Sequence, residues 1–164
     1  MKKAQQIGRL IAVLVAALVV PMDWFSKYLT HRYLTLGEST PVIDGFFNLV
    51  HVRNFGSAFG MFNQGRQTGF NTWFFAVASL IGLVLLIYLI RQEPAHRFWA
   101  LFCLGLLLGG LIGNQGERFF HHYVTDFIDI YMGTHHWPAF NVADSSISVG
   151  IGGYMLAMLT RDKN

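Results

Sequence analysis

Charged residues are scarce in this chain. Only 13% of its 164 residues are Asp, Glu, Lys or Arg, whereas 53% are apolar. Soluble domains carry about 25% charged residues, so the composition excludes that class and predicts a protein that lies in or on a membrane. Cysteine is nearly absent as well. The single Cys103 excludes an intramolecular disulfide, and we interpret it as a small buried apolar residue.

Several enzyme signatures are also missing. The chain has no Gly-x-Ser-x-Gly motif and no Ser-His-Asp arrangement, and Cys103 lies in the middle of an apolar stretch. No internal repeat, low-complexity tract or second domain is visible. We therefore expect one membrane-embedded domain over residues 1–164 and no serine or cysteine nucleophile.

Long apolar stretches predict four transmembrane helices. Residues 73–90 and 98–116 contain no charged residue, and each is close to the roughly 20 residues that cross a bilayer core. The apolar stretch near the N-terminus lacks a small-x-small cleavage site, so we interpret it as a retained helix, not a signal peptide. A stretch near the C-terminus contains one charge, Asp144. The predicted spans are residues 10–28, 71–90, 98–116 and 139–160.

The basic residues that flank these spans indicate an orientation. Seven lie on the side of both termini and five on the other side, and positive flanks favour the cytoplasm. We expect both termini in the cytoplasm and the longer loops outside it. The net charge of +3 follows from this topology, so no nucleic-acid partner is implied. The seven are Lys2, Lys3, Arg9, Arg91, Arg97, Arg161 and Lys163, and the five are Lys27, Arg32, Arg53, Arg66 and Arg118.

Polar residues gather at one end of the predicted spans. An unpaired carboxylate inside an apolar span, such as Asp144, costs several kcal/mol. Asp23 and Lys27 are four residues apart, hence on one helix face and able to pair. The glycines of "GGLIGNQGER" allow close helix packing. The Arg118 that ends this motif could hold a carboxylate or a lipid phosphate. The remaining members of the group are Asn54, Asn114, Glu117, Asp126, Asp129 and Asn141.

Asp126 in "VTDF" and Asp144 in "FNVADS" are the candidate catalytic pair. Two carboxylates held together near an interface tend to share one proton. One member can then take a proton from water while the other protonates a carbonyl oxygen, as in aspartic proteases. Asp129 is an alternative partner, although a capping or loop role suits it better. The loop "VIDGFFNLVHVRN" is typical of a short strand pair.

Four histidines flank the two loop aspartates and raise the alternative of a metal site. They occur as the adjacent pairs His121–His122 and His135–His136. Adjacent residues point in different directions in helices and in strands, so we expect no metal and no other cofactor.

These pieces together resemble the lipoprotein signal peptidases, or signal peptidase II, a family of bacterial membrane aspartyl proteases. The resemblance extends over nearly the whole chain, with the pieces in family order. It implies an all-α membrane protein with four transmembrane helices, a small extracytoplasmic β-cradle and a periplasmic helix, in the bacterial inner membrane. The matching pieces are "DWFSK" at 23–27, "RNFGSAF" at 53–59, "GGLIGNQGER" at 109–118, "VTDF" at 124–127 and "FNVADS" at 140–145.

The resemblance implies a function and assigns roles to matched residues. The family cuts diacylglyceryl-modified prolipoproteins just before the lipidated cysteine, which makes lipidated prolipoproteins and membrane phospholipid the expected partners of a monomer. Asp126 and Asp144 become the catalytic residues. The expected supporting and substrate-binding residues are Asp23, Lys27, Asn54, Gly56, Asn114, Glu117, Arg118 and Asn141.

The chain departs from the family pattern at three places. Trp24 stands where Gln is usual, and Glu117 where Asp is usual. After Asn114 the chain has the polar Gln115 and then Gly116, where apolar residues are more usual. We expect Glu117 to neutralise its neighbour Arg118. A catalytically impaired lipoprotein-binding relative is one alternative. A small transporter is another, but the apolar residues 73–90 argue against a polar path through the membrane.

Overall fold

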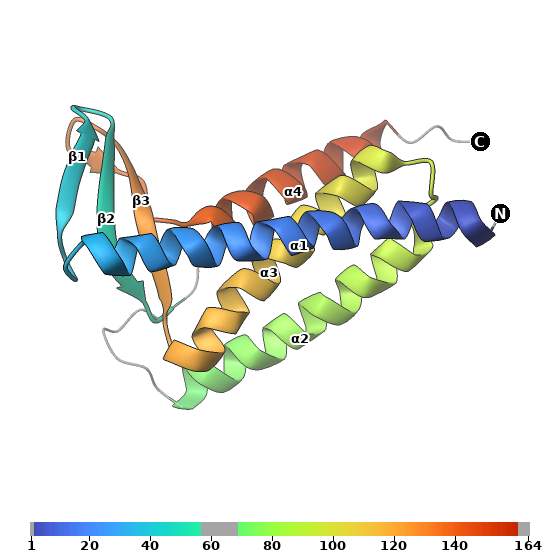
Figure 1. Cartoon of the computed structure of the whole chain (residues 1–164), viewed down its shortest axis with the longest axis horizontal. Coiled ribbons are helices and arrows are strands. Elements are labelled where there is room, and N and C mark those ends of the chain that lie inside the picture. The colour runs from blue at the N-terminus through green and yellow to red at the C-terminus, as the bar shows by residue number, and fades with distance from the viewer. Residues whose placement is uncertain (1, 57–68, 161–164) are drawn as a thin grey trace.

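The computed structural model describes residues 2–56 and 69–160. Four long helices form a bundle with a small sheet at one end (Figure 1). All four are long and apolar enough to cross a membrane, which confirms the prediction of four transmembrane helices. In the described ranges there is no fifth helix, so the expected periplasmic helix is not among those residues. The helices are α1 (Lys2–Tyr33), α2 (Gly69–Gln92), α3 (Phe98–His121) and α4 (Val142–Leu159).

Helices α1 and α3 continue well past the C-terminal ends of their predicted spans, for a local reason in each case. In α1 the buried face continues to Thr30, whose hydroxyl donates to the carbonyl of Ser26 within the same helix. In α3 the helix continues past Gly116 because Glu117 is buried among polar partners. Polar residues therefore prolong these helices where apolar periodicity alone predicts an end.

The fourth helix begins later than predicted. Asn141 is its N-cap, and its side-chain oxygen accepts a hydrogen bond from the backbone N of Asp144. An N-cap has extended backbone, and Asn141 has φ −132° and ψ −174°, so the helix starts at Val142 and not at Ala139.

The central helix α3 packs closely on α1 and α4. A Cβ at Gly105 would lie 2.7 Å from the carbonyl oxygen of Ala12 on α1, and a Cβ at Gly110 would lie 2.5 Å from that of Ala143 on α4. Only glycine permits these backbones to come so close. By contrast α2 is apolar on all faces and largely exposed, as expected for a helix that lies in lipid.

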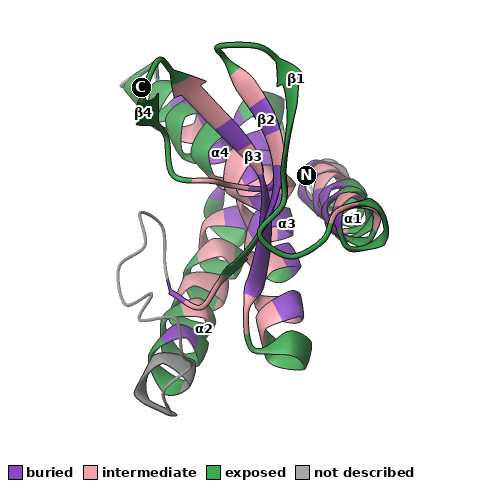
Figure 2. Ribbon diagram, turned by 90° about the vertical axis from the view of Figure 1, so that its left-hand side faces the viewer, coloured by how far each residue is buried: buried purple, intermediate pink, exposed green. Residues whose placement is uncertain are grey.

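Four strands form an antiparallel sheet across the end of the bundle (Figure 1). They are β1 (Ser39–Ile43), β2 (Phe47–Asn54), β3 (Val124–Met132) and β4 (His135–His136), in that spatial order. The predicted strand pair corresponds to β1 and β2, whereas β3 was not anticipated. Figure 2 shows β1 exposed throughout, while the first part of β3 is buried against the helices.

A second polar group lies at the other end of the helices. The buried Glu93 accepts a hydrogen bond of 3.1 Å from the Tyr154 hydroxyl and forms an ion pair with Arg97. Arg97 also donates to the carbonyl of Ala157, in the last turn of α4. This group caps the carbonyl end of α4 and ties it to the connection between α2 and α3.

Candidate active site

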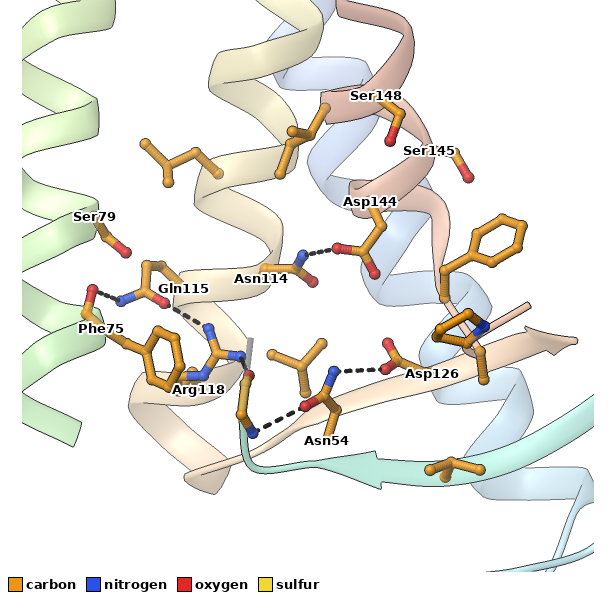
Figure 3. A pocket seen from close by; sticks show the side chains of 18 of the residues that line it. Asn54, Phe75, Ser79, Asn114, Gln115, Arg118, Asp126, Asp144, Ser145 and Ser148 are labelled. Carbon is orange, nitrogen blue, oxygen red and sulfur yellow. Dashed lines mark hydrogen bonds between the residues drawn. The ribbon is translucent and has the colours of Figure 1, made fainter. Parts of the chain in front are cut away.

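Five elements bring their polar residues together where the bundle meets the sheet. Figure 3 shows Asp126 on β3 and Asp144 in the first turn of α4, both on one cavity with Asn54 and Asn114. The cavity has a volume of about 760 Å³. Its walls are mostly apolar and come from α2, α3, α4 and the segment 137–140. Ligand pockets commonly have this size and this mixture of apolar walls and a few polar groups.

Asp126 is buried and held by two amides. Its Oδ1 accepts from Nδ2 of Asn141 at 2.7 Å, and its Oδ2 accepts from Nδ2 of Asn54 at 3.0 Å. Burial, and then the neighbouring carboxylate of Asp144, raise the pKa of Asp126 to about 7. The two amides and Lys27 oppose this shift without cancelling it. A carboxyl group with this pKa can hold a proton at neutral pH and release it.

Asp144 belongs to the cap of α4. Its Oδ1 accepts from Nδ2 of Asn114 at 2.8 Å, and its Oδ2 accepts from the backbone N of Asn141 at 3.3 Å. With the reciprocal bond from its own backbone N to the Asn141 side chain, it forms a capping box. A negative charge in the first turn of a helix is stabilised by the helix dipole. The dipole and the two hydrogen bonds therefore act in favour of the ionised form of this carboxylate.

Lys27 is the buried cation of the site. Its Nζ lies 2.7 Å from Asp23 Oδ2, 2.9 Å from Glu117 Oε2 and 3.0 Å from the side-chain oxygen of Asn114. The predicted pair of Asp23 and Lys27 is thus confirmed. The other oxygen of Asp23 accepts from the backbone N of Ala143 at 2.9 Å, so this carboxylate also fixes the start of α4.

Glu117 pairs directly with Lys27 and not with Arg118, contrary to the sequence prediction. Its carboxylate pairs with Lys27 and accepts two hydrogen bonds from Thr125, because its side chain points toward α1 and β3. Arg118 instead donates to the side chain of Gln115 and to the carbonyl of Gly56, both at 3.0 Å. Residues next to each other on a helix point in different directions, which is why the two charges separate.

Arg118 is positioned by neighbours on three elements. Its guanidinium lies 4.5 Å from the ring centre of Phe75, and Gln115 donates to the carbonyl of Phe75 at 3.1 Å. The backbone N of Gly56 donates to the side chain of Asn54 at 2.9 Å. Arg118 and Asn54 thus fix the end of β2 at the cavity, as Figure 3 shows.

The structure separates Asp129 from Asp126. The two are three positions apart on β3, so their side chains point to opposite faces of the strand. Asp129 accepts from Asn48 at 2.8 Å and lies 2.9 Å from Nδ1 of His136. Within residues 2–56 and 69–160, no three His, Cys, Asp or Glu side chains form a group that could hold a metal.

Sequence reasoning missed two features of the site. Thr125 is fully buried and bonded to Glu117, although it lies in the recognised "VTDF" piece. The many β-branched and aromatic residues in "VTDFIDIY" were the available signal for β3. The capping box was also missed, and the spacing of Asn141 and Asp144 was its signal.

Trp24, which departs from the family pattern, donates to the carbonyl of Gly113 at 3.2 Å.

Comparison with known proteins shows to which family this chain belongs. The family model described as signal peptidase (SPase) II matches residues 15–160. The chain belongs to the signal peptidase II family. Curated lipoprotein signal peptidases are similar along most of their length. That of Francisella tularensis subsp. novicida is 41% identical over 84% of each chain, and that of Syntrophus aciditrophicus is 37% identical over 94% of this chain and 95% of the relative.

Solved structures agree with this assignment. A bacterial membrane enzyme determined by the in meso method at 2.3 Å resolution superposes with a TM-score of 0.80, at 30% identity and 93% coverage of both chains. A second such structure, at 1.9 Å resolution, gives a TM-score of 0.79. The protein is therefore an aspartic endopeptidase of the signal peptidase II family and a multi-pass inner-membrane protein.

Proposed function

We propose that Asp126 and Asp144 are the catalytic residues with which this signal peptidase II cleaves diacylglyceryl-modified prolipoproteins just before the lipidated cysteine. The observation that carries the proposal is their joint placement: both carboxylates lie on one cavity, and each accepts hydrogen bonds from side-chain or backbone amides. Such a pair is equipped for general acid and general base catalysis on a peptide bond.

The two carboxylates have different environments, which suggests separate roles. Asp126 has its pKa raised to about 7 and is suited to protonate the carbonyl oxygen of the scissile bond. Asp144 lies at the start of α4, where the helix dipole favours its negative charge, and is suited to take the proton from the attacking water. Water then adds to the carbonyl carbon. As the tetrahedral intermediate collapses, Asp144 gives its proton to the departing nitrogen of the cysteine and Asp126 takes back the proton of the hydroxyl, so the C–N bond breaks and the signal peptide leaves as a carboxylic acid.

The remaining polar residues support the pair and the substrate. Asn114 and Asn141 orient the two carboxylates, and the buried Asp23, Lys27 and Glu117 hold α1, α3 and α4 in place around them. We assign Asn54, Gly56 and Arg118 to the substrate backbone, because they form the polar rim of the cavity at the end of β2.

The apolar wall of the cavity suits a lipidated substrate. Phe75, Leu111 and Ile147 come from three different helices and line the same cavity as the two aspartates. We propose that the acyl chains lie between these helices and fix the scissile bond at the bilayer surface. We also propose a monomer as the working unit, because side chains of one chain hold both carboxylates.

We propose that both termini are cytoplasmic and that the site faces the extracytoplasmic side. The start of α1 and the end of α4 lie at the same end of the bundle, opposite the sheet (Figure 1). The excess of basic residues on the side of the termini supports this orientation.

A cleavage assay with purified protein in detergent tests the proposal. The substrate is a diacylglyceryl-modified prolipoprotein, and loss of the signal peptide is followed by gel shift. Asp126→Asn and Asp144→Asn should each abolish cleavage while thermal unfolding stays cooperative. The same precursor without the lipid should be cut at least tenfold more slowly. Full activity of either variant would overturn the assignment, and equal cleavage of both precursors would overturn the lipid requirement.

A further inference from the structure

Thr125, the residue before Asp126, is held at its hydroxyl and at both backbone polar groups. It is fully buried, and its hydroxyl and backbone N donate to the two oxygens of Glu117 at 2.6 and 3.0 Å. Its carbonyl accepts from Nδ2 of Asn141 at 3.3 Å. Thr125 is bonded on one side to a carboxylate of α3 and on the other to the cap of α4.

The hydroxyl of Thr125 has a second partner, His31 on α1. Nε2 of His31 lies 2.9 Å from Oγ1 of Thr125. Because a carboxylate only accepts, the single hydroxyl proton of Thr125 points to Glu117. His31 must then donate from Nε2 to the oxygen of Thr125. The geometry therefore determines which ring nitrogen of His31 carries a proton.

The orientation of the His31 ring is fixed by a neighbouring histidine. The ring of His51 meets that of His31 edge to face at a centroid distance of 4.6 Å. His51 is buried, and its Nδ1 donates to the carbonyl of Leu34 at 2.9 Å, which ties β2 to the end of α1. His31 is thereby held against Thr125 even though it lies at the exposed end of the helix.

A continuous path of polar contacts runs from Thr125 to the other carboxylate. Glu117 Oε2 contacts Lys27 at 2.9 Å, and Lys27 donates to the Asn114 side chain at 3.0 Å. Asn114 in turn donates to Asp144 at 2.8 Å. Thr125 is thus joined by the backbone to Asp126 and by side chains to Asp144.

We propose that Thr125, oriented by His31, is a positioning residue that sets the spacing of the two catalytic carboxylates. This inference rests on the proposed function of Asp126 and Asp144. Without the hydroxyl of Thr125, one oxygen of Glu117 loses its donor, and the contacts of Glu117 with Lys27 and of β3 with α3 are free to shift. Misplacement of reacting groups by about 1 Å can cost about a hundredfold in rate.

Thr125→Val tests the role, because valine keeps the shape of threonine and removes only the hydroxyl. We expect kcat to fall by about tenfold to a hundredfold with KM changed by less than about twofold. Thr125→Ser, which restores the hydroxyl, should recover kcat to within about threefold. Thr30→Val is the matched control, since the buried Thr30 hydroxyl donates only to the carbonyl of Ser26 in its own helix. Its kcat should equal that of the wild type.

His31 is tested through its dependence on Thr125. His31→Ala should lower kcat by less than Thr125→Val does, and His31→Gln, whose amide can donate from a similar position, should recover it. In the double variant Thr125→Val/His31→Ala, the second substitution should add nothing, because His31 acts through the hydroxyl. If the two substitutions instead lower kcat by independent factors that multiply in the double variant, the role of His31 is wrong.

Asp126→Asn in the same assay distinguishes failure of this inference from failure of the proposed function. If Asp126→Asn is inactive while Thr125→Val has wild-type kcat, the positioning role is wrong and the catalytic pair stands. If Asp126→Asn is active, the proposed function is wrong. A lower kcat in Thr125→Val that serine does not recover, or an effect confined to KM or to thermal stability, would also overturn the positioning role.

Discussion

The side-chain amide of Asn141 donates a 2.7 Å hydrogen bond to Asp126. The same residue is the N-cap of α4, and its side-chain oxygen accepts from the backbone N of Asp144. One asparagine therefore starts the helix that carries one carboxylate and binds the other carboxylate directly. Its two tasks use different atoms, and this permits them to be separated by substitution.

Asn141→Ser should separate capping from orientation of Asp126. Serine is a good N-cap but has no amide to donate to Asp126, so the contribution of the cap to stability should be kept while kcat falls by about tenfold or more. Asn141→Ala should lose activity similarly and be about 1 kcal/mol less stable than Asn141→Ser. Thermal unfolding and cleavage rate, measured on both variants, check this. Wild-type activity in Asn141→Ser would show that the Asn141–Asp126 bond is not needed.

The raised pKa of Asp126 predicts a loss of activity in base. The carboxyl group must be protonated to act as the acid, and with a pKa of about 7 it loses that proton as the pH rises above 7. At one pH unit above the pKa about a tenth of the molecules retain it, so kcat/KM should fall about tenfold for each further unit. The measurement is kcat/KM from pH 5 to 9, with unfolding followed at each pH. A flat profile between pH 6 and 9 would contradict the role of Asp126 as the acid.

Features set by residues close together in the sequence could be predicted, whereas features set by contacts between distant segments could not. The spans follow from local composition, and the Asp23–Lys27 pair follows from spacing within one helix. Strand β3 was not predicted, because its partner β2 is distant in the sequence and the register that pairs Val52 with Asp126 is set by tertiary contacts. The partner of Glu117 was assigned wrongly for a similar reason. Adjacency in the chain suggested Arg118, whereas packing of α3 against α1 brings Lys27.

Close packing of α3 on α4 predicts different effects for two glycines. A Cβ at Gly110 would lie 2.5 Å from the carbonyl oxygen of Ala143, next to Asp144, so Gly110→Ala should move the first turn of α4. We expect the free energy of unfolding to fall by about 1–3 kcal/mol and kcat to fall at least about tenfold. At Gly152, on α4, no atom lies within 4 Å of an added Cβ. Gly152→Ala should keep full activity, and its free energy of unfolding should rise by up to about 1 kcal/mol. Equal effects of both substitutions on unfolding and cleavage would contradict this packing.

The buried charges of Asp23, Lys27 and Glu117 predict an asymmetry in stability. Lys27 is the cation in contact with both carboxylates, and all three side chains are at most 6% exposed. Lys27→Met leaves two buried carboxylates uncompensated, which should cost about 3–5 kcal/mol of stability. Glu117→Gln leaves the Asp23–Lys27 pair intact and should cost less, about 1–3 kcal/mol for the disturbed hydrogen bonds.

A double substitution tests whether charge is the cause of that asymmetry. In the Lys27→Met background, Asp23→Asn removes one uncompensated carboxylate and should raise the midpoint of thermal unfolding, although the same substitution alone should lower it. This reversal of sign is expected because Asp23 is stabilising only in the presence of the cation. If Asp23→Asn lowers the midpoint equally in both backgrounds, the hydrogen bond from Ala143 to Asp23, and not the ion pair, is the main contribution of Asp23.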